Sequence, residues 1–233
     1  SKAEALYLAI PMQRIPVVAV SPFQSSLRAL GPGVTDQLRQ LRAKGCLWRD
    51  SGLARVRLEG ADAARWLHGQ CSQSVIDMEP GEGRFACFLD PRGKVLYSTE
   101  LLRADDHFDL LIDGDQAQAL VDRFDAYIFT EDIQVHLDPN LLESLWVQGP
   151  HAEEVCKKSA SYPSLSLTDR AWLCHEKIIW RRASIPGEAG VVAHGDPEAI
   201  QILHDELLYL AKGQVLPMGD QAALVARLED GLP

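Results

Sequence analysis

The sequence predicts an α+β protein in which antiparallel strands are covered by helices. Its composition is that of a folded domain, because hydrophobic residues make up 46% and charged residues 24% of the 233 positions. Segments with apolar side chains at every second position alternate with segments at helical spacing. The links between successive strand segments are short, which favours antiparallel neighbours.

The first clear strand runs from Leu53 to Glu59, where apolar and charged residues alternate. Apolar residues at helical spacing follow over 63–67, and another helix is expected to begin near Asp115. The other strands of this half are expected over 85–89, 94–103, 107–112 and 133–137. The segment Asp90-Pro91-Arg92-Gly93 suits a type I turn, so the order is β-α-β-β-β-α-β.

The segments before and after this part of the chain also alternate loosely between strand and helix patterns. Upstream, we expect an extended segment over 15–20 and a helix over 35–43. Downstream, strands are expected over 142–147, 172–182 and 191–194, and helices after Gly149-Pro150, over 200–207 and from Gln221 to Gly231. Since no low-complexity linker separates the two halves, we expect them to pack closely.

The charge of the chain excludes some partners. There are 23 Lys and Arg residues against 33 Asp and Glu residues, a net charge of −10. Because phosphate contact needs clustered basic side chains, we expect neither direct nucleic-acid binding nor attraction to an anionic membrane surface. No stretch reaches the ~18 apolar residues of a membrane span, and the apolar N-terminal segment lacks the basic lead-in of a signal peptide. A cytoplasmic protein is therefore expected.

The five cysteines show no metal-binding or disulfide pattern. They are Cys46, Cys71, Cys87, Cys156 and Cys174, with no CxxC pair among them. We expect mostly buried, reduced thiols and no metal site. Beside Lys44, the thiol of Cys46 is either activated through a lowered pKa or inert packing at the start of a strand.

Several polar segments have both a functional and a structural interpretation. Gln70 and the Ser-Gln-Ser cluster after it either bind a polar heterocycle or form a helix end and surface loop. Arg92 and Lys94 at the hairpin tip either hold an anion or serve solubility. Glu188 either accepts N–H bonds from an aminopyrimidine ring or is a solvated turn residue. Arg227 pairs with a neighbouring carboxylate or with a ligand. No Ser-His-Asp, GxGxxG or P-loop pattern is present.

Four segments, read together, resemble the folate-binding YgfZ family, which is related to the aminomethyltransferase (T-protein) of the glycine cleavage system. The run LARVRLEGADAARWLHGQCSQSV is similar to the family's opening strand, glycine, helix and GQ loop. FACFLDPRGKVLYSTELLR is similar to the next strand and glycine turn, and SLWVQGPHAEEV to the mid-chain strand and helix. ARLEDGLP is similar to the R-x-E-x-G-[IL]-P helix end. The resemblance covers residues 46–233.

Two departures separate the chain from parts of this pattern. In the glycine-cleavage enzyme, the strand after the glycine turn carries an Asp-Asp pair that contacts the reacting folate, and the matching positions here are Tyr97 and Ser98. Without that carboxylate, acid–base help in aminomethyl transfer is hard to supply, which points to the YgfZ branch and leaves enzymatic activity open. That branch also has a later KGC-[FY]-x-GQE motif, which is expected after Pro233. Lys44-Gly45-Cys46 matches it only by chance.

The resemblance implies two ferredoxin-like domains with antiparallel sheets, arranged as a ring around tetrahydrofolate. The first domain would comprise residues 1–52 plus 134–222, and the second, inserted domain residues 53–133 plus 223–233. The C-terminal barrel domain of the family is expected to be absent from this chain.

The resemblance further implies a tetrahydrofolate-binding accessory protein that supports iron–sulfur cluster assembly or repair, and thereby tRNA modification. The implied partners are the folate small molecule and iron–sulfur enzymes or assembly factors. Two alternatives are a folate-dependent aminomethyltransferase-like one-carbon enzyme and a non-catalytic interaction module without folate.

Five residues are the expected ligand contacts. Arg227, carried over from the helix end, would hold the pterin or the glutamate tail. Glu188 would bind the aminopyrimidine edge, Tyr97 and Phe85 would stack on the pterin, and Gln70 would add a polar contact.

Overall fold

The computed structural model describes residues 32–163, 171–185 and 188–229. Its helices are α2 Pro32–Ala43, α3 Ala63–Gln70, α4 Gly114–Tyr127, α5 Ala152–Cys156, α6 Pro197–Ala211 and α7 Asp220–Glu229. Its strands are β1 Cys46–Glu59, β2 Gly83–Leu89, β3 Val95–Arg103, β4 His107–Asp113, β5 Gln134–Leu137, β6 Leu142–Gln148, β7 Trp172–His175, β8 Ile178–Ile185, β9 Glu188–Gly195 and β10 Leu216–Pro217.

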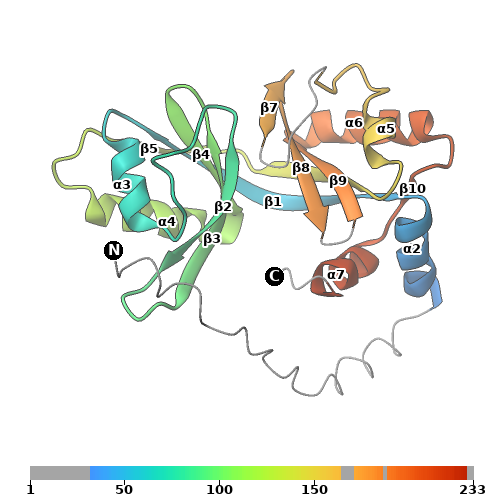
Figure 1. The fold of residues 1–233 in the computed structure, drawn as a ribbon, viewed down its shortest axis with the longest axis horizontal. Helices are drawn as coiled ribbons and strands as arrows, with labels where there is room; N and C mark the ends of the chain where they lie inside the picture. Colours follow the sequence, from blue (N-terminus) through green and yellow to red (C-terminus); the bar gives the residue numbers. More distant parts are fainter. Residues whose placement is uncertain (1–31, 164–170, 186–187, 230–233) are drawn as a thin grey trace, which may run out of the picture.

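All ten strands belong to one sheet, with the order β2-β3-β4-β1-β6-β9-β8-β7 and with β5 and β10 also paired to β1. Every pairing is antiparallel except the short one between β1 and β10. The predicted α+β class with antiparallel strands is therefore confirmed. Figure 1 shows β1 crossing between two groups of elements. We call β2–β5 with α3 and α4 the inserted unit, and β6–β10 with α2, α5, α6 and α7 the flanking unit.

The strand β1 serves both units because a bulge divides it. Residues up to Ser51 pair with β6, and residues from Leu53 onward pair with β4. The register shifts between them at Gly52, whose φ of +94° is readily adopted only by glycine. An extra residue reverses the alternation of side chains. Trp48 before the bulge and Leu53 after it therefore lie on the same face of the sheet. Their ladder partners in β6 are Trp146 and Leu142, respectively.

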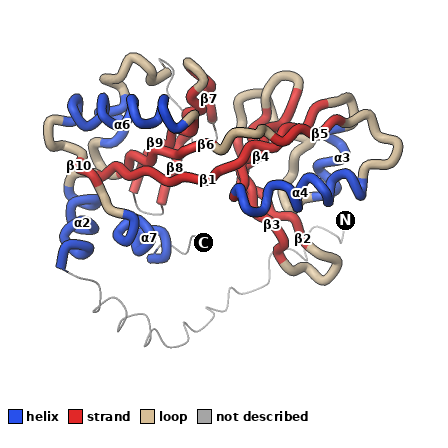
Figure 2. Tube along the Cα trace, turned by 180° about the vertical axis from the view of Figure 1, so that it is seen from behind, coloured by secondary structure: helices blue, strands red, loops and turns tan. Residues whose placement is uncertain are grey.

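Each unit buries its own core beneath its helices. In the inserted unit, α3 and α4 cover one face of the sheet, and Trp66 and Phe124 meet edge to face at 5.2 Å. In the flanking unit, α5 and α6 cover β6, β8 and β9 around the fully buried Trp180. The opposite side of the flanking sheet is covered by α2 and α7 (Figure 2).

The sheet curls until its two ends meet. The backbone N–H of Trp172 in β7 donates to Gly81 O at 2.9 Å, just ahead of β2. The indole N–H of Trp172 donates to Glu82 O at 3.1 Å, and Glu82 forms a bridge with Ala171. A small apolar cluster joins the two units there, and its members are Leu102, Leu111, Leu142, Trp172 and Ile179. The uncovered face of the inserted sheet is thereby turned toward β7 and β8.

Two predicted elements differ from the structure. The single strand expected over 172–182 is a hairpin, because Glu176 and Lys177 adopt positive φ values of 50° and 67° and reverse the chain. The strand expected from Leu53 begins at Cys46, since the bulge interrupts an alternation that otherwise continues upstream. The segment expected to be extended over 15–20 lies outside the described residues.

The predicted division into two domains stays a prediction, but the structure shows where part of one predicted segment packs. Residues 223–233 were expected with the inserted domain. In the described part of this segment, Ala223 and Ala226 pack with Leu41 of α2 and Cys46 of β1, in the flanking unit. Among the described helices, none is long and apolar enough to cross a membrane.

Candidate functional site

Among the residues that the structure describes, a linked group of polar side chains lies between the two units. We call the surface that carries it the inter-unit face. In the inserted unit, this is the side of β2, β3 and β4 that faces away from α3 and α4. In the flanking unit, it is the side of β6, β8 and β9 that faces away from α5 and α6. Side chains opposed in a ladder share one face, so the register of the strands identifies the members of this face.

An aromatic ring and a carboxylate lie side by side on this face. Phe85 of β2 is directly opposed to Glu100 of β3. Opposed residues of an antiparallel pair have Cβ atoms about 4.5–5.5 Å apart, so the ring and the carboxylate are immediate neighbours. Phe85 is 51% exposed, so a ligand could reach its ring. The two residues together can bind a planar ring that carries polar atoms at its edge.

A chain of polar side chains leads inward from this carboxylate. Glu100 Oε1 lies 3.2 Å from Arg181 Nη2 of β8, and Arg181 Nε donates to His194 Nε2 at 3.2 Å. The other ring nitrogen of His194 lies 2.8 Å from Ser144 Oγ. The exposed fraction of the side chains falls from 29% at Glu100 to 13% at Arg181, and His194 and Ser144 are buried. We call Glu100, Arg181, His194 and Ser144 the polar chain.

The direction of these hydrogen bonds determines the proton on His194. Because a guanidinium can only donate, Nε2 of His194 accepts, and Nδ1 therefore carries the proton and donates to Ser144 Oγ. Burial, and then the charge of Arg181, lower the pKa of His194 well below its usual value. In this form His194 cannot take a proton from Ser144. The pair is thus a structural support and not an activated nucleophile.

An indole ring lies beside the polar chain. The guanidinium of Arg181 lies 5.7 Å from the ring centroid of Trp146, and Trp146 stacks on Trp48 with an interplanar angle of 3°. Among the described residues, the buried Nε1 of Trp146 has no hydrogen-bond partner. The indole therefore extends the apolar part of this face next to a charged group.

The structure separates some of the predicted contacts. Tyr97 is opposed to Phe88 and packs against the core under α3 and α4, so it lies on the other face of the sheet from Phe85. Gln70 is the last residue of α3, which covers that same core face. Phe85 and Tyr97 are therefore not brought together. By contrast, Ser98 is opposed to Cys87 and shares the inter-unit face with Glu100.

Glu188 begins β9, and Arg227 lies near the end of α7. The side chains of both lie outside the part of the chain that the structure describes. Their expected contacts with a ligand stay predictions.

The polar segments around these residues are engaged locally. The hydroxyl of Ser72 accepts from Cys87 N at 3.0 Å, and the amide of Gln73 donates to Phe85 O at 3.2 Å, so the loop after α3 is bound to the edge of β2. At the hairpin tip, the carboxylate of Asp90 accepts from the backbone N–H groups of Arg92 and Lys94. Both observations favour the structural interpretation of these segments.

All five cysteines are free thiols. Burial raises the pKa of Cys46 to about 11 and that of Cys156 to about 12, so neither is an activated thiol. Cys174 is exposed, although a buried position was expected, because it lies on the edge strand β7.

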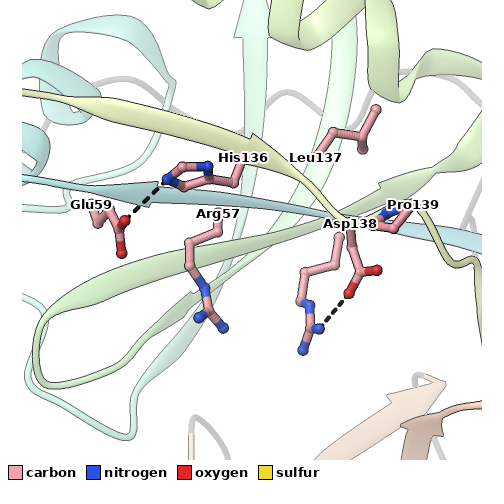
Figure 3. Close-up of a pocket in the computed structure, with 7 residues that line it drawn as sticks. Arg57, Glu59, His136, Leu137, Asp138 and Pro139 are labelled. Carbon is pink, nitrogen blue, oxygen red and sulfur yellow. Dashed lines mark hydrogen bonds and ion pairs between the residues drawn. The ribbon is translucent and has the colours of Figure 1, made fainter.

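A polar depression of about 360 Å³ lies elsewhere, along β1 and β5 (Figure 3). Its charged side chains are joined in pairs: Arg55 with Asp138, and His136 with Glu59 at 3.0 Å. Arg57, another lining residue, forms two hydrogen bonds with the buried Asp109. Both arginines that line the depression have a carboxylate partner, so neither guanidinium is left unpaired for an anionic ligand.

The polar chain was not predicted, because it joins strands from both units. Arg181 did carry a usable signal. It follows Ile179 and Trp180 in an apolar strand, and a charged residue at such a position is rarely buried without a partner.

The fold and the inter-unit face define an α+β protein whose two units share one curled antiparallel sheet. Residues 17–233 match the family described as the GCVT N-terminal domain, and the chain belongs to this family.

Two relatives are aminomethyltransferases. The protein of Lysinibacillus sphaericus (strain C3-41) is 23% identical over 207 residues, which are 86% of this chain and 56% of the relative. The protein of Aquifex aeolicus (strain VF5) is 23% identical over 201 residues, again 86% of this chain and 54% of the relative. The chain thus spans about half the length of the relatives it matches.

A solved structure shows the same fold. The glycine cleavage system aminomethyltransferase T from Bartonella henselae matches with a TM-score of 0.74 and 24% identity, over 86% of this chain and 55% of that one. The T-protein fold expected from the resemblance is thereby confirmed.

Proposed function

We propose that this chain is the tetrahydrofolate-binding part of a YgfZ-type accessory protein, which supports iron–sulfur cluster assembly or repair and thereby tRNA modification. One observation carries the choice of this branch. The two positions that hold the Asp-Asp pair in the glycine-cleavage enzyme are Tyr97 and Ser98, so neither has a carboxylate. Tyr97 packs on the core, and Ser98 offers only a hydroxyl to the inter-unit face. A protein with these residues can bind a folate but has lost the acid–base group at that place.

The inter-unit face supports a folate as the ligand. A pterin is a planar ring with polar atoms along its edge, and it needs a surface to stack on and groups to bond that edge. The exposed ring of Phe85 supplies the surface, and Glu100 with Arg181 supplies an acceptor beside a donor. We keep Arg227 and Glu188 as proposed contacts for other parts of the ligand. Tyr97 and Gln70, on the other face, would influence binding only through the packing of β3 and α3.

The second candidate is a folate-dependent aminomethyltransferase-like one-carbon enzyme. Two relatives carry that name. The carboxylate of Glu100 also lies two positions beyond Ser98 on the same face, so an acidic group is present near the place of the missing pair. Turnover in a glycine-cleavage assay with the natural full-length protein would favour this candidate. No turnover, together with tetrahydrofolate binding, would favour the accessory protein.

The experiment that tests folate binding is a calorimetric titration with tetrahydrofolate. The natural full-length protein is titrated beside the 233-residue chain and beside the full-length Arg227→Ala variant. Arg92→Ala, at the exposed hairpin tip, is the matched control. Binding that Arg227→Ala weakens and Arg92→Ala leaves unchanged would support the proposal. No binding by folded full-length protein would remove folate and leave an interaction module, in which Arg227→Ala changes stability only.

The iron–sulfur role is tested separately in cells. Loss of the protein should lower the activity of iron–sulfur enzymes and the level of modified tRNA, and the natural protein should restore both. Normal values of both after the loss would contradict this role while leaving folate binding intact.

A further inference from the structure

We propose that the outer face of α6 is a docking surface for another protein, and that the segment it binds is amphipathic, with apolar side chains flanked by Lys or Arg. By the outer face of α6 we mean the stripe formed by Glu198, Ile202, Asp205, Glu206 and Tyr209. The helix α6 lies on the opposite side of the flanking sheet from α2 and α7 (Figure 2). This stripe is therefore separate from the inter-unit face and from any ligand bound there.

The helix α6 carries apolar side chains on two sides. Ile200, Leu203 and Leu207 are buried in the core of the flanking unit. Residues seven positions apart lie on one face of a helix, so Ile202 and Tyr209 lie together on another side. They are 64% and 81% exposed. A helix that covers a sheet normally has a single apolar stripe, so the core does not account for this second pair.

The helix α4 of the inserted unit provides an internal comparison. It covers its own sheet as α6 does, with Leu120 and Phe124 buried beneath it. On the side turned away from that core it carries Gln118, Asp122 and Asp125, which are all exposed and polar. A helix in this position can thus meet water with polar side chains alone. The exposed apolar pair on α6 points instead to a protein surface that covers it.

The charges around the apolar pair indicate which partner fits. Glu198, Asp205 and Glu206 frame the pair on the same stripe. Asp205 lies 2.9 Å from Nδ1 of His204, and Glu206 accepts a hydrogen bond from Ser159 at 3.0 Å. In the described part of the chain, none of the three carboxylates forms an ion pair with Lys or Arg. A partner's Lys or Arg can therefore pair with them while its apolar side chains cover the exposed pair.

A second copy of this chain does not fit the same stripe. In a two-fold symmetric dimer, the same patch of both copies meets itself. The carboxylates of one stripe would then face those of the other, and like charges in an interface are costly. The net charge of −10 adds repulsion between copies at longer range. Charge complementarity therefore selects a basic segment of a different protein.

The first experiment maps what lies against the stripe. Benzoylphenylalanine, a photoreactive amino acid, replaces Tyr209 in the natural full-length protein, which is irradiated in the cells that naturally make it. Phe129 is the matched position, because it is also 81% exposed but lies outside α6. We expect a crosslinked product at position 209 that is absent at position 129. Mass spectrometry should place the crosslink in an amphipathic segment of another protein that contains Lys or Arg.

The second experiment measures the affinity of that segment. It is synthesised, and its Kd for the full-length protein is measured by calorimetry. Ile202→Ser should raise the Kd about tenfold or more, as expected for an apolar anchor. Glu198→Gln combined with Asp205→Asn should also raise the Kd and make it less dependent on salt. Asp122→Asn combined with Asp125→Asn is the matched control, because it removes two carboxylates from the outer side of α4.

Each result decides for or against the docking surface. A crosslink between two copies of this chain, a crosslink within one chain, or a mapped segment without Lys or Arg would overturn the proposal. The absence of a product at position 209, or equal products at both positions, would do the same. If the α4 variant raises the Kd as much as the α6 variants, the attraction is a general effect of net charge and the assignment to α6 is wrong. All the substituted side chains are exposed, so the melting temperatures should stay close to that of the wild type.

Discussion

Arg181 and Glu100 belong to different units of the molecule and form an ion pair of 3.2 Å, with Arg181 only 13% exposed. This contact lies beside the apolar cluster that joins the units and adds a specific polar link to it. It also connects the most exposed aromatic group of the inter-unit face, through Glu100, with a buried histidine.

The first prediction concerns the stability contributed by Arg181. In Arg181→Met, the partly buried carboxylate of Glu100 and the buried Nε2 of His194 both lose their donor. We expect the free energy of unfolding to fall by about 1–3 kcal/mol. Urea unfolding at pH 7 measures it. Arg39→Met is the control, because its pair with Asp36 is exposed and should contribute less than about 1 kcal/mol. Equal losses in both variants would contradict the special role of Arg181.

The second prediction concerns pH. The pKa of His194 is lowered in the folded state by burial and by the charge of Arg181, so the unfolded chain binds the proton more readily. The contribution of His194 is therefore fully present above its unfolded pKa of about 6.5 and is lost as the pH falls below it, by at most about 1.4 kcal/mol per pH unit. Unfolding free energies at pH 7.5, 6.5 and 5.5 should fall less steeply in His194→Gln than in the wild type. An equal effect from the exposed His175→Gln would contradict this assignment.

The third prediction concerns the thiols. Cys174 is exposed, whereas burial raises the pKa of Cys46 and Cys156 to about 11 and about 12. Because the thiolate is the reactive form, a thiol reagent at pH 7.5 should label Cys174 first. Cys46 and Cys156 should react only when the protein unfolds. Mass spectrometry identifies the labelled residue, and Cys174→Ser should remove the fast phase. Rapid labelling of Cys46 in native protein would show that its environment is more open than described.

The fourth prediction concerns the turn between β7 and β8. Lys177 has a φ of 67°, which costs energy for a residue with a side chain and suits glycine. Lys177→Gly should therefore raise the melting temperature, with a gain of up to about 1 kcal/mol. Lys158→Gly is a control without a positive φ. A lower melting temperature for Lys177→Gly would mean that the lysine side chain contributes more than the strain costs.

Local patterns predicted most of the elements, and pairing between distant strands explains what they missed. The alternation over 53–59 predicts a strand because one face of it is buried on the inserted core. The first part of the same strand was not predicted, because the bulge at Gly52 reverses the alternation of apolar and polar residues. Likewise, no local pattern marks a reversal at Glu176 and Lys177, because neither residue type is typical of a turn.

The candidate site required a register that the sequence does not contain. Phe85 and Tyr97 are both aromatic residues on predicted strands, and only their ladder partners, Glu100 and Phe88, show that they lie on opposite faces. The polar chain is harder still to predict, because its members lie in both units. Glu100 is in β3 of the inserted unit, and the other members are in β6, β8 and β9 of the flanking unit. Contacts of this kind depend on how the whole sheet curls.

The bulged strand β1 has a consequence for how the protein unfolds. It supplies ladder hydrogen bonds to β6 on one side of Gly52 and to β4 on the other. Because one strand belongs to both units, β1 cannot detach from one unit without also disturbing its pairing in the other. The described protein should therefore melt as one cooperative block in calorimetry, and a cut at the bulge should disable both units together.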